Sequence, residues 1–325
     1  MTIEEQEPLM SHNYDPELTA GLAIIPVLNV SDLADSRAKA VAAEEMLARQ
    51  IDRSGVITRD VHVPTTHSGA HDLWLRIHSP ESGTGPFPLI YSMHGGGFCM
   101  GSLAVSDARS VELVREVQAV VVSVDYRLAP EHPYPTGLED SYSGLVWVTE
   151  NAAELGIDAT RVAVHGQSAG GNLATALSLL ARDRGGPDIS FQYLGVPVLD
   201  HHMNTPSVTA YVDTPFWDLP NNVAAWTYYL GGLHSGDDVP IHAAPAQAEA
   251  KDLEGLPPAY VAVMQFDPLR DEGIAYAAKL AQAGVATELH LYPGAFHGSS
   301  FIQSAHVSQR ERAEEVAVLR RALHE

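Results

Sequence analysis

Cysteine, lysine and long apolar runs are scarce in this chain of 325 residues. Cys99 is the single cysteine, which excludes an intramolecular disulfide and a cysteine-based zinc site. No apolar run of about 18 residues occurs, and residues 1–8 lack the basic and apolar regions of a secretory signal. We therefore expect a soluble, cytoplasmic protein that does not insert into a membrane.

Basic residues are few as well. The chain has 19 lysines and arginines against 41 aspartates and glutamates, which gives a formal net charge of −22. A surface of this sign repels polyanions, so we expect neither a nucleic acid nor an anionic membrane as a partner. Hydrophobic residues make up 45% of the chain. This proportion and the length favour one large folded domain, or one domain with an insertion.

Apolar segments of strand character alternate with segments of helical spacing over most of the chain. Strands are expected at residues 56–63, 73–78, 89–93, 119–124, 161–164, 191–198, 259–264 and 287–292. Helices are expected at residues 33–51, 108–117, 139–154, 169–182, 273–282 and 308–323. The first two strands should form an antiparallel hairpin, and the later alternation predicts a parallel sheet and an α/β fold. Residues 201–240, rich in aromatics and proline, break the alternation and are interpreted as an insertion.

A Gly-x-Ser-x-Gly pattern, Gly166 to Gly170, lies between an expected strand and an expected helix. This is the pattern of a nucleophile elbow, in which a serine occupies a sharp strand-to-helix turn. Glycines two positions to either side remove bulk that would collide with the neighbouring backbone. The pattern makes Ser168 a candidate nucleophile, although such a pattern also occurs by chance in ordinary turns.

Three consecutive glycines, Gly95 to Gly97, follow the strand expected at residues 89–93. In that place, backbone N–H groups can stabilise a developing oxyanion. The candidate donors are the N–H groups of Gly96, Gly97 and Ala169. A nucleotide-binding loop is disfavoured, because neither a Gly-Lys-Ser/Thr nor a Gly-x-Gly-x-x-Gly pattern is present.

Asp267 and His297 follow the last two expected strands, in the chain order Ser, Asp, His that α/β-hydrolases use. Catalytic groups collect on such loops at the carboxyl ends of parallel strands. We therefore expect His297 to act as the general base and Asp267 to orient it. The pairs His67 and His71, or His201 and His202, lack a carboxylate or third histidine at a recognisable spacing, so no metal site is predicted.

Over residues 87–300 the chain resembles the hormone-sensitive lipase family, also called the bacterial family IV esterases. The shared motifs are His94-Gly-Gly-Gly-Phe98, Asp125-Tyr-Arg-Leu-Ala-Pro-Glu-His-Pro-Tyr-Pro135, Gly166-Gln-Ser-Ala-Gly-Gly-Asn172, Asp267-Pro-Leu-Arg-Asp271 and Phe296-His-Gly298. The resemblance implies an α/β-hydrolase core, here residues 54–200 and 241–325, under a helical cap of residues 1–53 and 201–240. It also implies carboxylesterase activity on small esters with short to medium acyl chains, without a cofactor. The segments at residues 125–127 and 131–133 look like structural supports of the elbow.

Several assignments depend on this resemblance or on position alone. Phe98, Phe216 and Trp217 are the candidates for lining the substrate pocket, and a homodimer is expected through the last strand. Gln167 departs from the Asp or Thr that usually precedes the nucleophile, and we expect it to leave the chemistry unchanged. A lactonase, an amidase or an acyltransferase with the same triad, and a non-catalytic ligand receptor on the same scaffold, are the alternatives.

Overall fold

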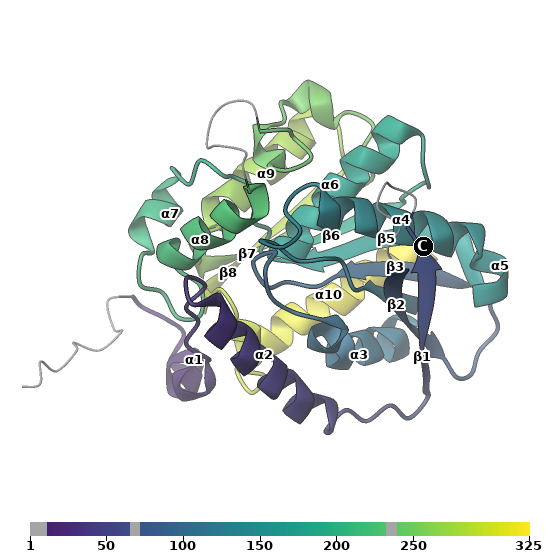
Figure 1. Ribbon diagram of the computed structural model, residues 1–325, viewed down its shortest axis with the longest axis horizontal. Coiled ribbons are helices and arrows are strands. Elements are labelled where there is room, and N and C mark those ends of the chain that lie inside the picture. Colours follow the sequence, from purple (N-terminus) through teal and green to yellow (C-terminus); the bar gives the residue numbers. More distant parts are fainter. Residues whose placement is uncertain (1–11, 66–71, 232–238) are drawn as a thin grey trace, which may run out of the picture.

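The computed structural model describes residues 12–65, 72–231 and 239–325. One eight-stranded sheet, counted within these residues, runs through the molecule in the order β1-β2-β4-β3-β5-β6-β7-β8 (Figure 1). Its strands are β1 (Val56–Pro64), β2 (Asp72–Pro80), β3 (Phe87–Met93), β4 (Val120–Val124), β5 (Ile157–Gln167), β6 (Phe191–Gly195), β7 (Ala259–Phe266) and β8 (Thr287–Phe296). The helices are α1 (Pro16–Gly21), α2 (Leu33–Ala48), α3 (Asp107–Val117), α4 (Thr136–Glu150), α5 (Ala152–Leu155), α6 (Ala169–Arg184), α7 (Pro206–Ala210), α8 (Leu219–Leu230), α9 (Arg270–Gln282) and α10 (His306–His324).

The sheet is antiparallel at one end and parallel elsewhere. Strand β1 pairs with β2 in an antiparallel hairpin, as expected, and β2 pairs antiparallel with β4. From β4 to β8 every pairing is parallel. All residues of β4 are buried, because helices cover both faces of a parallel sheet. The predicted α/β-hydrolase fold is confirmed.

Two apolar layers flank the sheet. On one face, α4, α6 and α9 pack through residues that include Leu145, Leu177 and Leu280. On the other face, α3 and α10 pack through residues that include Val114 and Leu319. The sheet is therefore held between helices, and the carboxyl ends of its parallel strands all open toward one edge.

Some element boundaries differ from those expected. The helix expected at residues 139–154 is divided into α4 and α5, and Gly156 ends the second piece with a φ of +70°. The last strand was expected to end at Tyr292, but β8 continues to Phe296 across a register shift opposite β7. Gln265 explains the continuation, because its side-chain oxygen accepts a hydrogen bond from Gly294 N at 2.7 Å.

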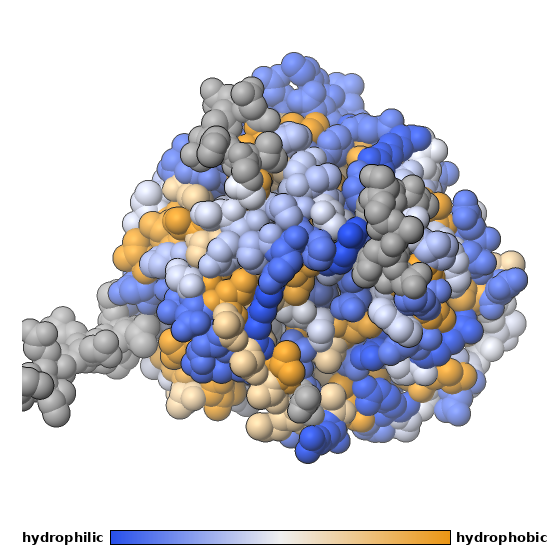
Figure 2. Space-filling view, viewed as in Figure 1, coloured by the Kyte–Doolittle hydropathy of each residue, from blue (hydrophilic) through white to orange (hydrophobic). Residues whose placement is uncertain are grey.

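The N-terminal segment and the insertion contact each other, although about 190 residues separate them in sequence. Asn221, in α8, accepts a hydrogen bond from Val30 N at 2.8 Å through its side-chain oxygen. Apolar side chains remain exposed on the N-terminal segment, notably Ile24 and Val27 before α2 and Met46 within it. In Figure 2 the lower part of the visible face, where α2 lies in Figure 1, mixes apolar and hydrophilic residues. No helix in the described part of the chain is long and apolar enough to cross a bilayer.

Candidate active site

Ser168 occupies a strained turn between β5 and α6. Its backbone has φ 57° and ψ −120°, a conformation that is costly for a residue with a side chain. A Cβ at Gly166 would lie 2.1 Å from Gly170 O, and a Cβ at Gly170 would lie 2.0 Å from Met93 O. The two glycines therefore allow a turn that any other residue would block. The serine itself is held by a hydrogen bond from its N to Gly195 O at 2.8 Å.

Two hydrogen bonds join Ser168, His297 and Asp267. His297 Nε2 lies 3.1 Å from Ser168 Oγ, and His297 Nδ1 lies 2.8 Å from Asp267 Oδ2. All three side chains are buried, with Asp267 at 0% exposure. Leu269 N donates to the other carboxylate oxygen of Asp267 at 2.8 Å, so both oxygens have a donor. This arrangement fixes the imidazole and directs Nε2 at the serine.

Register brings the acid and the base together. Strands β7 and β8 are parallel neighbours, and Phe266 pairs with Phe296 at their carboxyl ends. Asp267 and His297 are the next residues on each strand, so the two side chains leave the sheet side by side. The extension of β8 beyond the expected end at Tyr292 produces this register. The sequence placed both residues on loops after strands, and the structure places them directly at the strand ends.

The glycine loop lies beside the candidate nucleophile, since a Cβ at Gly95 would lie 3.5 Å from Ser168 Cβ. Gly96 and Gly97 have φ values of +123° and +59°, and a Cβ at Gly96 would lie 2.2 Å from Met100 O. Among the described residues, no acceptor takes a hydrogen bond from the N–H groups of Gly96, Gly97 or Ala169. Ala169 is also the first residue of α6, where the positive end of the helix dipole lies. The three N–H groups are thus available to an anionic oxygen.

Tyr126 contacts the residue that begins the glycine loop, His94. Its hydroxyl donates to His94 O at 2.8 Å, and its ring stacks on the His94 ring with centroids 4.3 Å apart. Burial lowers the pKa of His94 to about 4, so this imidazole is neutral at physiological pH. Arg127 binds the buried Asp140 with two side-chain bonds, and Glu131 binds Arg37 of α2 in the same way. The segment at residues 125–133 therefore contacts the glycine loop, α4 and α2.

Phe216 and Trp217 lie beside the imidazole of His297. The Phe216 ring is stacked against His297 with centroids 6.2 Å apart, and the Trp217 ring is 5.9 Å away. Trp217 also covers the glycine loop, because a Cβ at Gly97 would lie 2.6 Å from its Cη2. Phe98 is engaged differently, since it stacks on Tyr229 of α8 at 3.8 Å. Phe216 and Trp217 are thus close to the candidate base, while Phe98 joins the glycine loop to α8.

Sequence reasoning missed Glu272. This residue of α9 is 1% exposed, and its Oε1 accepts a hydrogen bond from Leu199 N at 2.7 Å. Burial raises the pKa of Glu272 well above its usual value, and the nearby charges of Asp200 and Asp267 raise it further. The side chain joins α9 to the segment after β6. Its position five residues after Asp267 indicated that it lies near the candidate site, but no sequence pattern predicts its hydrogen bond with Leu199.

Comparison with known proteins agrees with this geometry. Residues 90–301 match the family described as alpha/beta hydrolase fold. Carboxylesterase NlhH of Mycobacterium tuberculosis is 42% identical over 261 residues, which cover 79% of this chain and 81% of that protein. The arylesterase of Saccharolobus solfataricus is 34% identical, over 91% of this chain and 94% of that protein.

A solved structure shows the same fold at higher coverage. Bacterial heroin esterase superposes with a TM-score of 0.93 and 43% identity, over 96% of this chain and 99% of that one. The family match covers well over half of the chain, and these relatives exceed 30% identity over most of their length. The chain therefore belongs to the α/β-hydrolase fold and, within it, to the hormone-sensitive lipase-like carboxylesterases.

Proposed function

We propose that the protein hydrolyses small esters of short to medium acyl chains, with Ser168 as nucleophile, His297 as general base and acid, and Asp267 as the orienting acid. The observation that carries the proposal is the buried chain of two hydrogen bonds, 3.1 Å and 2.8 Å long, that joins these three side chains. Two relatives, an arylesterase and a heroin esterase, carry the names of the esters on which they act, which supports small esters as substrates.

The reaction follows from the geometry. Ser168 Oγ attacks the ester carbonyl carbon while its proton passes to His297 Nε2. Asp267 Oδ2 accepts the bond from Nδ1–H and so holds the tautomer whose Nε2 faces the serine. His297 then gives the proton to the leaving alcohol, and the acyl group remains on Ser168. A water molecule, deprotonated by His297, hydrolyses this acyl-enzyme and restores the serine.

The oxyanion forms when the carbonyl carbon becomes tetrahedral. The N–H groups of Gly96, Gly97 and Ala169 are the proposed donors, because no described residue accepts from them. Their backbone is held in place by the Tyr126–His94 contact and by the elbow itself. Donors that are already oriented stabilise the developing charge without reorganisation during the reaction.

The acyl group is proposed to lie against Phe216 and Trp217, the two aromatic side chains that flank His297. Phe98 was also a candidate for the pocket, and its stacking on Tyr229 favours an indirect role in holding the glycine loop. A pocket with two fixed aromatic walls limits the length of the acyl chain. This limit is the reason to propose short to medium chains.

We propose that residues 1–53 and 201–240 form a cap over a core of residues 54–200 and 241–325. The hydrogen bond between Val30 and Asn221 joins the two parts of the cap. Trp217 on Gly97 and Arg37 on Glu131 fasten the cap to the core. The substrate would then be enclosed between the cap and the carboxyl ends of the strands.

A homodimer through β8 is proposed as well. Strand β8 is the last in the sheet order, and Leu289 and Leu291 on it are 43% and 44% exposed. An exposed apolar edge strand favours pairing with a second copy. Light scattering through the micromolar range tests this, and a monomer at every concentration would contradict it. Location in the cytoplasm stays a prediction.

Purified protein assayed against p-nitrophenyl esters, an amide, a lactone and added alcohol acceptors tests the reaction class. We expect ester hydrolysis to exceed the other activities, and acyl transfer to alcohols to stay minor. Ser168→Ala should abolish both turnover and covalent labelling by a fluorophosphonate. Labelling that persists in this variant would refute the assignment of the nucleophile, while preferred turnover of the lactone or amide would change only the substrate.

A further inference from the structure

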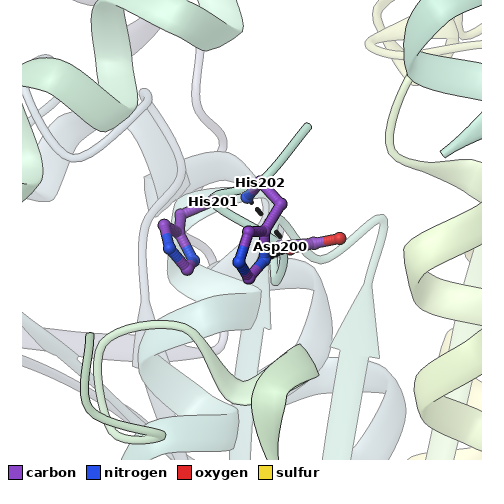
Figure 3. A group of neighbouring side chains, drawn as sticks. All are labelled: Asp200, His201 and His202. Atoms are coloured by element: carbon purple, nitrogen blue, oxygen red, sulfur yellow. Dashed lines mark hydrogen bonds and ion pairs between the residues drawn. The ribbon is translucent and has the colours of Figure 1, made fainter. Parts of the chain in front are cut away.

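The turn that follows β6 brings together a carboxylate and two imidazoles. Asp200, His201 and His202 are consecutive, and one ligand atom from each lies within 4.8 Å of the others. Figure 3 shows the two imidazole rings side by side, with the Asp200 carboxylate directed at His202. Asp200 Oδ1 is 3.0 Å from His202 Nδ1, and the ring centroids of His201 and His202 are 4.1 Å apart.

This donor set suits a borderline transition metal. Two imidazoles and one carboxylate are typical ligands of Zn²⁺, Co²⁺, Ni²⁺ or Cu²⁺. With bonds of about 2.0–2.1 Å, neighbouring ligand atoms around tetrahedral zinc lie about 3.3 Å apart. The 3.0 Å pair of Asp200 and His202 is already close to that spacing. The third ligand atom needs a movement of roughly 1–1.5 Å, judged against the same bond lengths.

The buried member of the group has an outer partner of the kind that metal-binding histidines have. His201 is 1% exposed, and its Nδ1 lies 2.9 Å from the side-chain amide of Gln247. Rotation of that amide by 180° would present its oxygen to an Nδ1–H. The other ring nitrogen, Nε2, lies 3.5 Å from the same amide and would exchange that contact for the metal. A residue outside the coordination shell would then fix the ring and its tautomer.

The other two members face solvent. The side chain of His202 is 35% exposed and that of Asp200 is 15% exposed. An ion can therefore reach the group from water, and water can complete its coordination. The net charge of −22 raises the local concentration of cations around the chain.

We propose that Asp200, His201 and His202 bind one divalent transition-metal ion, outside the ester-hydrolysing site. No metal site was predicted at His201 and His202, because no carboxylate or third histidine at a recognisable spacing was found for them. The carboxylate is instead the adjacent residue, and the turn folds it onto His202. The alternative pair, His67 and His71, lies outside the described residues.

Binding would cross-link the turn that leaves the sheet next to the nucleophile. Val198 N donates to Ser168 O at 3.3 Å, and Leu199 N donates to Glu272 at 2.7 Å. These bonds place the metal-binding turn two residues from the backbone that supports the elbow. An ion that binds only the folded turn stabilises the native state, so the melting temperature should rise with its concentration.

The test is zinc binding by untagged protein, measured by equilibrium dialysis and elemental analysis. We compare the wild type with Asp200→Asn, His202→Ala and a matched control, His242→Ala. His242 pairs with Asp183 at 3.0 Å, which is also a histidine–carboxylate contact, but it belongs to no described group of three ligands. His202 is partly exposed, so its replacement should leave the fold intact, and circular dichroism checks this.

We expect the wild type and His242→Ala to bind one ion more than the other two variants, or to bind it at least about tenfold more tightly. Cu²⁺ adds a spectroscopic readout, because the Trp226 ring lies 6.1 Å from His201 and its fluorescence should be quenched. His202→Ala should lose that quenching. Equal zinc binding by the wild type and a folded His202→Ala variant would overturn the proposal, and so would an equal loss in His242→Ala. Any zinc that binds at His297 would bind equally to all four proteins, so it does not affect the difference between them.

Discussion

Replacement of Trp217 by alanine should move the preference of the enzyme toward longer acyl chains. The indole is 2% exposed, lies 5.9 Å from the His297 ring and covers Gly97. In the proposed site it closes the space beside the reacting carbonyl. Its removal opens that space to methylenes that the wild type leaves in water.

The magnitude follows from burial. Each methylene that becomes buried contributes about 0.8 kcal/mol, which is a factor of about four in kcat/KM when the gain is realised in the transition state. Two additional methylenes should therefore raise the ratio of long-chain to short-chain kcat/KM about fifteenfold. Since Trp217 also supports Gly97, a proposed oxyanion donor, kcat should fall for every chain length. A fall in kcat that is equal for all esters can be distinguished from a change in how kcat/KM depends on chain length.

The assay is a series of p-nitrophenyl esters from acetate to laurate at steady state. Trp217→Phe is the matched control, because it keeps an aromatic wall and the indole N–H has no hydrogen-bond acceptor among the described residues. Phe216→Ala removes the second wall, which is stacked on His297. An unchanged chain-length profile in both alanine variants, with the fold intact, would assign these two residues to the interior of the cap and refute the pocket.

Three other perturbations test the site and its surroundings. Replacement of His297, of Asp267 or of both by alanine should lower kcat by orders of magnitude. The double variant should lose far less than the product of the two single losses, because the residues act as one unit. Losses that add in free energy would contradict a triad. Gln167→Asp should change kcat by less than about tenfold, or about 1.4 kcal/mol. The Gln167 side chain packs toward Gly195, where a Cβ would lie 2.8 Å from Gln167 Cγ. A larger change in kcat without loss of thermal stability would contradict this prediction. Burial raises the pKa of Glu311 from 4.5 to about 8, so the native state keeps a proton that the unfolded state releases, and stability is lost as the pH rises through that window. Glu311→Gln should therefore lie within about 1 kcal/mol of the wild type at pH 5 and exceed it by about 4 kcal/mol at pH 8 in urea unfolding. Equal stability at pH 8 would show that the carboxyl ionises freely.

Chain order and strand periodicity predicted the sheet and the three candidate catalytic residues. The reason is physical, because loops at the carboxyl ends of parallel strands meet at one edge and residues just after strands are therefore brought together. Ser168, Asp267 and His297 each follow a strand, so their proximity could be inferred without side-chain contacts. The hairpin of β1 and β2 was predictable as well, since two segments of strand character lie close together in the sequence.

Contacts between side chains distant in sequence could not be predicted in this way. His165 contacts Glu315 at 2.8 Å across 150 positions, and this contact depends on how α10 packs under β5. Arg109 binds the same carboxylate, and together these neighbours lower the pKa of Glu315 to about 2. No periodicity indicates that helix packing, so the buried ion pairs appear only in the structure.

The acidic side chains between Asp267 and Glu272 contact three different parts of the molecule. Asp267 contacts the His297 imidazole, Asp271 accepts a hydrogen bond from Ser207 N at 2.8 Å, and Glu272 accepts one from Leu199 N. Ser207 lies in α7 of the proposed cap, so Asp271 fastens the cap to the same loop that holds the base. Three acidic residues within six positions thus contact His297, α7 of the proposed cap and the turn after β6. Because α9 begins at Arg270, Asp271 and Glu272 lie in its first turn, and Asp267 lies three residues before the helix. The contact of Asp271 with the proposed cap is therefore only four positions from Asp267 in the sequence.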